Sequence, residues 1–228
     1  MKVESEIFEV RFIYILDLTI NMDIHFVTKN KHKVEEAQIA LAGSEIKIHL
    51  LEANKEEPSD WKLEKVAYVN AKKIANETKK VVIVEDTGVF FEAFDNFPGN
   101  KPKRYFEQLG YKGLLAMFFE SKVLENGNEE KKEITNRKAY FRTIIGYCEP
   151  GKEPMLFSGE LDGTISKEVK GMDANVLPYE RIFICNEKKD GENEDTTHYL
   201  YEYTREEKGK FSHRAKAFRK LKEYLLSK

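Results

Sequence analysis

The sequence predicts an α/β fold with two lobes and a cleft between them. In the first half of the chain, apolar runs of strand length alternate with segments whose apolar residues recur at helical spacing. The second half is richer in strand-like runs separated by turn signals, a pattern typical of antiparallel hairpins. The chain has 228 residues, of which 41% are hydrophobic, enough for one large domain or two small lobes with a proper core.

The first half supplies the alternating elements. Strands are predicted at 24–28 and 46–51, and helices at 34–41, 61–77 and 104–120. Gly43 closes the first of these helices, whereas Gly110 and Gly113 are expected to break the third. Residues 52–60 form an acidic loop between the second strand and the second helix.

A central strand is predicted at 81–84, where four apolar β-branched residues follow one another without alternation, which indicates a strand covered on both faces. We expect this strand to stop at Glu85 and Asp86, because two carboxylates cannot continue into a dry core unpaired. Thr87-Gly88 then allows a sharp turn, and residues 89–94 would continue beyond it as a hairpin.

The two carboxylates would thus lie at the carboxyl end of a strand, the edge at which open α/β sheets bind ligands. Adjacent carboxylates suit a hard divalent cation or a general base that activates water. For this segment alone, an ordinary acidic turn in solvent is the more frequent structure. Whether Glu85 and Asp86 form a ligand site therefore has to be judged together with the motifs in the rest of the chain.

A second candidate site is the polar turn that follows the first strand. Thr28 ends the strand, Asn30 is a plausible N-cap, and Lys33 lies in the first turn of the helix. Free N–H groups at a helix start, together with nearby lysines, form a common anion site. The alternative is an ordinary basic turn, since no glycine-rich dinucleotide or Walker fingerprint is present.

The second half predicts a loop or hairpin tip at 125–133 and further strands at 138–148, 155–165 and 179–185. Gly159 and Gly163 punctuate the second of these strands. Residues 186–195 are charged and are interpreted as a surface loop. A terminal helix is predicted at 211–226 with Ser212 as its N-cap.

Composition excludes several functional classes. The formal net charge of -2, from 38 basic and 40 acidic residues, gives no overall field for nucleic acid or an anionic membrane. Cys148 and Cys185 each lie in an apolar strand-like run and are interpreted as buried free thiols in a reducing compartment. No apolar run is long enough to span a bilayer.

Residues 1–21 are interpreted as an N-terminal extension: an added strand, a disordered tail or the product of an early start codon.

Four segments, taken in order and spacing, resemble the inosine/xanthosine triphosphate pyrophosphatase family, enzymes that act on non-canonical purine nucleoside triphosphates. The segments are 28–33, Glu85-Asp86-Thr87-Gly88, Leu177-Pro178-Tyr179-Glu180, and Ser212-His213-Arg214 with Lys208 before it. The resemblance covers 22–228 as a single domain of two lobes. It implies an elongated mixed sheet flanked by helices and a magnesium-dependent hydrolysis of NTP to NMP and pyrophosphate. It also implies a cytoplasmic homodimer that takes a small-molecule substrate rather than nucleic acid or membrane.

The resemblance also implies roles for individual residues. Asp86 and Lys33 would be catalytic, and Asp86, Glu57 and Glu85 would hold magnesium, with Glu56 as a substitute for Glu57. The implied substrate-binding residues are Thr28, Asn30, Lys33, Thr87, Leu177, Tyr179, Glu180, Lys208, His213 and Arg214. Donors around the base would select the 6-oxo group that adenine lacks.

One segment departs from the family pattern. The family usually has Phe-Gly-Tyr/Trp-Asp-Pro where this chain has Leu177-Pro178-Tyr179-Glu180-Arg181. Leucine packs on a purine without π-stacking, and glutamate is one methylene longer than aspartate. Two alternatives to selective hydrolysis therefore stand: the same reaction on a broader or canonical set of nucleotides, and a nucleotide-binding regulatory protein without turnover.

Overall fold

The computed structural model describes residues 22–123, 129–189, 191, 193 and 196–228. The N-terminal extension and part of the two predicted loops at 125–133 and 186–195 lie outside the described residues. The strands are β1 (Met22–Val27), β2 (Ile46–Leu51), β3 (Val82–Phe91), β4 (Phe97–Gly99), β5 (Phe119–Val123), β6 (Glu129–Glu133), β7 (Lys138–Cys148), β8 (Met155–Ile165), β9 (Phe183–Cys185) and β10 (His198–Tyr199). The α-helices are α1 (Lys31–Ala40), α2 (Leu63–Thr78), α3 (Pro102–Ala116), α4 (Arg205–Phe211) and α5 (His213–Leu226). Short 3₁₀ helices cover Glu92–Phe94, Pro178–Arg181 and Leu200–Glu202.

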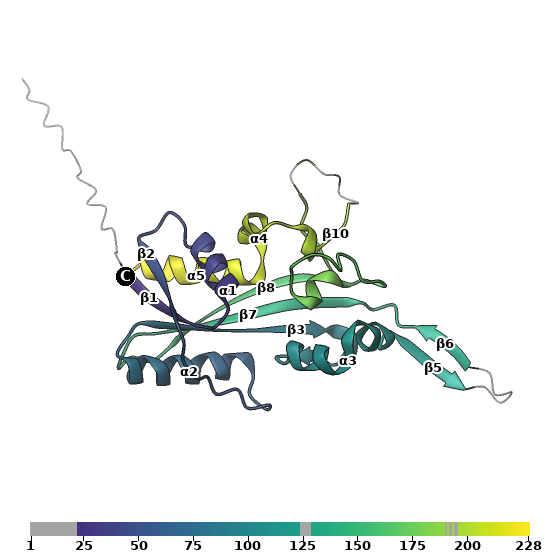
Figure 1. Cartoon of the computed structure of the whole chain (residues 1–228), viewed down its shortest axis with the longest axis horizontal. Helices are drawn as coiled ribbons and strands as arrows, with labels where there is room; N and C mark the ends of the chain where they lie inside the picture. Colours follow the sequence, from purple (N-terminus) through teal and green to yellow (C-terminus); the bar gives the residue numbers. More distant parts are fainter. Residues whose placement is uncertain (1–21, 124–128, 190, 192, 194–195) are drawn as a thin grey trace, which may run out of the picture.

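One mixed sheet organises the molecule, with the strand order β10-β9-β8-β7-β3-β1-β2 and β4 paired to β3. β1 is parallel to β2 and β3, whereas β7 is antiparallel to both β3 and β8. Helices α1 and α5 cover one face of the sheet and α2 covers the other (Figure 1). The predicted α/β class, with an elongated mixed sheet flanked by helices, is confirmed.

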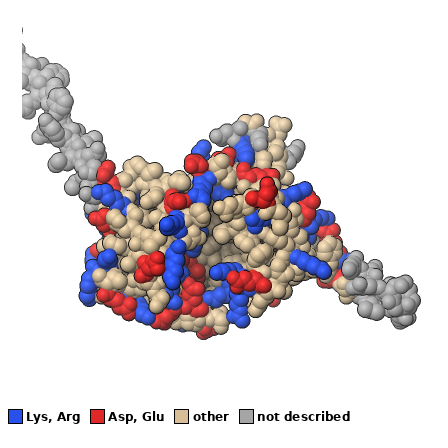
Figure 2. Space-filling model, in the orientation of Figure 1, with Lys and Arg blue, Asp and Glu red and all other residues tan. Residues whose placement is uncertain are grey.

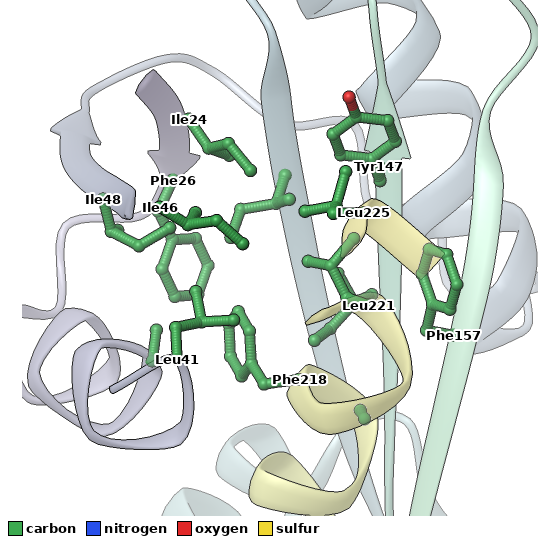
Figure 3. Close-up of a cluster of buried hydrophobic side chains, with 14 residues drawn as sticks. Ile24, Phe26, Leu41, Ile46, Ile48, Tyr147, Phe157, Phe218, Leu221 and Leu225 are labelled. Carbon is green, nitrogen blue, oxygen red and sulfur yellow. The ribbon is translucent and has the colours of Figure 1, made fainter. Parts of the chain in front are cut away.

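The two largest of the four hydrophobic clusters among the described residues lie in different lobes. In one lobe, the apolar face of α5 packs with α1 against β1, β2 and β3, around Phe26, Phe218 and Leu221 (Figure 3). In the other, Phe91, Phe118 and further aromatic residues pack beneath α3 and β9. The long strands β3, β7 and β8 run through both lobes and connect them (Figure 1).

The central strand differs from the prediction, because β3 does not stop at Glu85 but continues to Phe91. The premise that its carboxylates would be unpaired was wrong: the Glu85 side chain is 1% exposed and is neutralised by two cations from other elements. A buried carboxylate is tolerated when it is paired in this way. The pairing partners are far away in the sequence, so the local pattern could not reveal them.

Smaller differences have local causes. The predicted strand at 179–185 begins as the 3₁₀ helix Pro178–Arg181, and only Phe183–Cys185 joins the sheet. The helix predicted at 104–120 ends at Ala116, with the expected break at Gly110, where φ is 57°. Ser212 is an N-cap as predicted, but the short helix α4 precedes it.

Both cysteines are buried free thiols, as predicted. Among the described helices, none combines the length and apolar character needed to cross a bilayer.

Candidate active site

The site lies where the edge of β3 is open. β1 pairs with β3 only as far as Val27 opposite Val84, and β4 begins to pair at Val89. Between these points, residues 85–88 pair with β7 on one side, and no described strand pairs with them on the other. This edge adjoins the carboxyl end of β1, where a ligand site was predicted at the polar turn after the strand.

Glu85 is the centre of a buried ion-pair network on the face covered by α1 and α5. Lys33 Nζ lies 2.5 Å from one carboxylate oxygen, while Arg214 Nε lies 3.2 Å from the other. The Thr87 hydroxyl donates a hydrogen bond of 2.5 Å to Glu85, and Arg214 also pairs with Glu36. Burial alone would raise the pKa of Glu85, but the charges of Arg214 and Lys33 outweigh it and hold the pKa well below the usual range.

Asp86 belongs to the opposite face, because successive side chains of a strand alternate. Its neighbours Val82 and Val84 pack against α2, which places Asp86 on the α2 side near the acidic loop. Burial, followed by the negative charges of Glu57 and Glu85, raises its pKa to about 6 in spite of the opposing effect of Lys55. Among the described residues, none makes a hydrogen bond or ion pair with the Asp86 carboxylate.

The acidic loop distinguishes Glu57 from Glu56. Lys55 Nζ lies 2.7 Å from the Glu57 carboxylate, and the charge of Glu57 acts on Asp86. The Glu56 carboxylate instead pairs with Lys73 on the outer surface of α2, at 2.5 Å. Glu57 is therefore the carboxylate that the fold brings towards Asp86.

The turn after β1 carries the N-cap that was predicted for α1. Asn30 caps α1, and its side chain accepts a hydrogen bond of 3.0 Å from the backbone N–H of His32. The Thr28 hydroxyl accepts from the Asn30 N–H, also at 3.0 Å. Lys33 follows in the first turn of α1, which contains no acidic residue. The helix start and the lysine thus adjoin the open edge of β3.

The first turn of α5 carries the second set of predicted residues. His213 is 7% exposed and stacks on Phe141, with ring centroids 4.9 Å apart, and Arg214 is 5% exposed. This burial depends on Gly159, since a Cβ at that position would lie 2.0 Å from the His213 carbonyl oxygen. Burial, together with the charge of Arg214, lowers the pKa of His213 well below its usual value, so the ring is neutral at pH 7. Lys208, on α4, forms an ion pair with Glu180.

One predicted residue does not fit its predicted role. Tyr179 is 4% exposed, packs against Phe91 and donates a hydrogen bond of 3.0 Å to the Pro102 carbonyl, so it is a core residue and not a substrate contact. Both oxygens of Glu85 lie against cations, so in this structure the residue anchors the ion-pair network, and its role as a magnesium ligand stays a prediction. In contrast, Leu177 is 53% exposed and is free to contact a ligand.

Arg181, which replaces the usual proline, has a structural explanation. Its guanidinium donates to the carbonyls of Gly171 and Ala174, at 2.9 and 2.5 Å, and to the Tyr111 hydroxyl at 3.0 Å. It therefore ties the loop before Leu177 to α3.

Sequence reasoning missed three residues near the site. Lys55 is the only cation between 52 and 60, a signal that was present in the sequence. Glu36 pairs with Arg214, and the Thr143 hydroxyl lies 2.7 Å from that of Thr87. No local pattern marks these two residues, because their partners come from distant elements.

Figure 2 shows that one face of the molecule is hollowed near its middle, with basic and acidic side chains along the border of the hollow. Such a mixed border suits a ligand that carries negative charge together with a cation.

The raised pKa of Asp86 predicts a gain of stability on its removal. The folded-state pKa of about 6 exceeds the ordinary value of 3.8, so ionisation at higher pH costs more in the folded state. In a metal chelator, Asp86→Asn should therefore raise the free energy of unfolding at pH 8 by about 1–2 kcal/mol. The gain should shrink as the pH falls from 6 to 4, because the aspartic acid is then protonated. Urea unfolding at pH 8 and pH 4 measures this gain. An equal gain at both pH values would contradict the raised pKa of Asp86.

Comparison with known proteins places the chain in a family. The sequence profile of the Ham1 family matches residues 24–224. The chain belongs to the Ham1 family. A relative named dITP/XTP pyrophosphatase, from Methanopyrus kandleri, is 37% identical, with 89% of this chain and 96% of the relative covered. A second relative of that name, from Methanosarcina acetivorans, is 34% identical over 90% of this chain and 98% of its own length.

The fold of this Ham1 chain is also that of solved Ham1 structures. The Ham1 protein of Coxiella burnetii superposes with a TM-score of 0.69, covering 91% of this chain and all of that protein, at 22% identity. The Staphylococcus aureus Ham1 protein superposes with a TM-score of 0.61 at 19% identity, covering 90% and 98% of the two chains.

Proposed function

We propose that this Ham1 chain is a nucleoside triphosphate pyrophosphatase that hydrolyses non-canonical purine nucleotides such as dITP, ITP and XTP to NMP and pyrophosphate. The observation that carries the proposal is a partly buried carboxylate, Asp86, at the open edge of β3, within electrostatic reach of Lys33 in the first turn of α1. Relatives of at least 34% identity over about nine-tenths of the chain bear the name of this activity.

The triphosphate would lie against the turn between β1 and α1. Thr28 and Asn30 shape the turn at the start of α1, where the helix dipole favours an anion. Lys33 adds a cation that Glu85 holds in place. Arg214 supports the same arrangement from α5, because it fixes the position of Glu85.

Magnesium would be held by Asp86 and Glu57, which supply the hard oxygen donors that this ion prefers. The described residues contain no group of three or more acidic, histidine or cysteine side chains suited to a metal. Two carboxylates are sufficient, because Mg²⁺ sites are commonly completed by waters and substrate phosphates. When bound, the ion would supply increased acidity to a water molecule. Asp86 would orient that water and accept its proton. The water would then attack the α-phosphorus, and pyrophosphate would leave with the electrons of the broken P–O bond.

Base recognition would involve the junction of α4 and α5. The ion pair between Lys208 and Glu180 presents both a donor and acceptors, and neutral His213 lies nearby on the same face. The exposed Leu177 would pack against the purine. Donors that are left unpaired against adenine would penalise ATP relative to a 6-oxo purine.

The reaction is tested by measuring pyrophosphate release from ITP, dITP, XTP, ATP and GTP in parallel with magnesium. We expect the 6-oxo non-canonical nucleotides to be the best substrates. Equal rates on ATP and ITP would contradict the selectivity, and orthophosphate as the only product would contradict the reaction. The broader-substrate alternative draws support from Leu177, which offers no π-stacking surface to a base.

Lys208→Met tests base selectivity directly. Removal of the amine takes away a donor to the 6-oxo group and releases Glu180. The ratio of kcat/KM for ITP to that for ATP should therefore fall by about 10–100-fold. Lys222→Met, at the far end of α5, is the matched control and should leave the ratio unchanged. An equal loss on both nucleotides would show that Lys208 contacts phosphate instead of the base.

A homodimer and a cytoplasmic location, both expected from the family resemblance, belong to the same proposal. Size-exclusion chromatography with light scattering tests the first, and cell fractionation tests the second.

A further inference from the structure

Lys55 is a cation that the fold places against the proposed metal carboxylates. Its amine lies 2.7 Å from the Glu57 carboxylate, and its side chain is 21% exposed. Burial would lower the pKa of Lys55, but the contact with Glu57 and the charges of Asp86 and Glu85 raise it, so the amine is charged. The residue therefore neutralises acidic groups on the α2 face, whereas Lys33 and Arg214 are committed to Glu85 on the opposite face of the sheet.

The loop that carries Lys55 is anchored at Glu56 and at Glu57. The side chain of Asn70 is completely buried in α2, and it accepts a hydrogen bond of 2.7 Å from the Glu56 N–H and donates one of 2.8 Å to the Glu56 carbonyl. Lys101 Nζ donates to the Glu57 carbonyl at 3.2 Å. These backbone bonds fix the positions of Lys55 and Glu57 relative to α2. The lysine is thus held beside the carboxylates by the fold.

We propose that Lys55 is the resident counter-cation of the Asp86–Glu57 carboxylate pair, and that a divalent cation must displace its amine from Glu57 in order to bind. This inference rests on the proposed function, because it takes Asp86 and Glu57 as the metal carboxylates. It assigns Lys55 a positioning role: the amine prevents repulsion between the two carboxylates in the metal-free protein and weakens the affinity of the site for metal.

The physical reason is competition between cations for one acceptor. Two carboxylates in a partly buried site repel each other, and a nearby ammonium relieves that repulsion. A divalent ion offers a stronger field to the same oxygens, but it must first break the contact between Lys55 and Glu57. Removal of the ammonium should therefore tighten metal binding and, at the same time, make the fold more dependent on metal.

The experiment measures Mn²⁺ binding to the full-length protein by electron paramagnetic resonance, without nucleotide. Lys55→Met should lower the Kd for Mn²⁺ by about tenfold. Lys55→Arg keeps the charge and should bind Mn²⁺ as the wild type does. Lys62→Met removes an exposed lysine from the same loop and is the matched control. In EDTA, Lys55→Met should melt below the wild type, and saturating Mn²⁺ should remove most of the difference.

Two outcomes would overturn the inference while leaving the proposed function intact. One is an unchanged or weaker Mn²⁺ affinity in Lys55→Met. The other is a weaker metal-free affinity for pyrophosphate with unchanged Mn²⁺ affinity, which would make Lys55 a phosphate ligand. Asp86→Asn separates these outcomes from a failure of the proposed site: it should abolish most Mn²⁺ binding, and wild-type affinity in that variant would overturn both proposals together.

Discussion

Asp86→Asn is expected to lower kcat for ITP by about 1,000-fold, the largest kinetic effect we predict. The amide neither accepts a proton from water nor offers the anionic oxygen that magnesium prefers. Binding of the nucleotide should largely survive, because the phosphate contacts at Thr28, Asn30 and Lys33 lie on another element. Turnover is measured by pyrophosphate release, and binding by calorimetry with a non-hydrolysable ITP analogue.

The matched control is Asp162→Asn, an exposed aspartate on β8, which should keep wild-type turnover. Unchanged turnover in Asp86→Asn would remove this carboxylate from the mechanism. A wild-type protein that binds the analogue but releases no pyrophosphate from any nucleotide would favour the alternative of a regulatory protein without turnover.

Arg214→Met is expected to give the largest loss of stability. It removes a buried guanidinium that pairs with Glu85 and Glu36, and both carboxylates then lose a partner. Breaking a buried pair from one side costs about 3 kcal/mol or more, because the remaining charge stays in a poorly solvated position. For a chain of this size, that loss should lower the melting temperature by roughly 6–12 °C. Differential scanning calorimetry and urea unfolding measure the effect.

Two further variants give this prediction its specificity. Arg219→Met, on the same helix, removes a half-buried arginine with one hydrogen bond to the Gly209 carbonyl and should cost about 1 kcal/mol. The double variant Arg214→Met with Glu85→Gln should recover part of the loss, because the buried carboxylate that has lost its arginine partner is gone. A single-variant loss as small as that of Arg219→Met would show that Lys33 alone neutralises Glu85.

The local sequence pattern was sufficient to predict an element where that element depends only on residues within its own segment. The apolar alternation of 138–148 and the turn that follows predicted β7 with its observed bounds, and Met155–Ile165 was equally well defined. Ser212 was recognised as an N-cap because a capping residue acts on the next three residues alone. The acidic pair at the end of an apolar run marked the site for the same kind of local reason.

The different surroundings of Glu85 and Asp86 are set by the tertiary structure: Glu85 lies in a buried ion-pair network, and Asp86 lies on the opposite face of the sheet. The sequence determined that two carboxylates, a lysine turn and a histidine–arginine helix start belong to one α/β chain of the Ham1 family. It did not determine that β3 continues through the carboxylates, because this requires Lys33 and Arg214, which lie 52 and 129 positions away from Glu85. It also did not reveal that Tyr179 faces the core, since a short 3₁₀ helix rotates that side chain away from the surface. Charge compensation and side-chain direction depend on partners brought together only by folding, and for this reason they could not be predicted from local sequence.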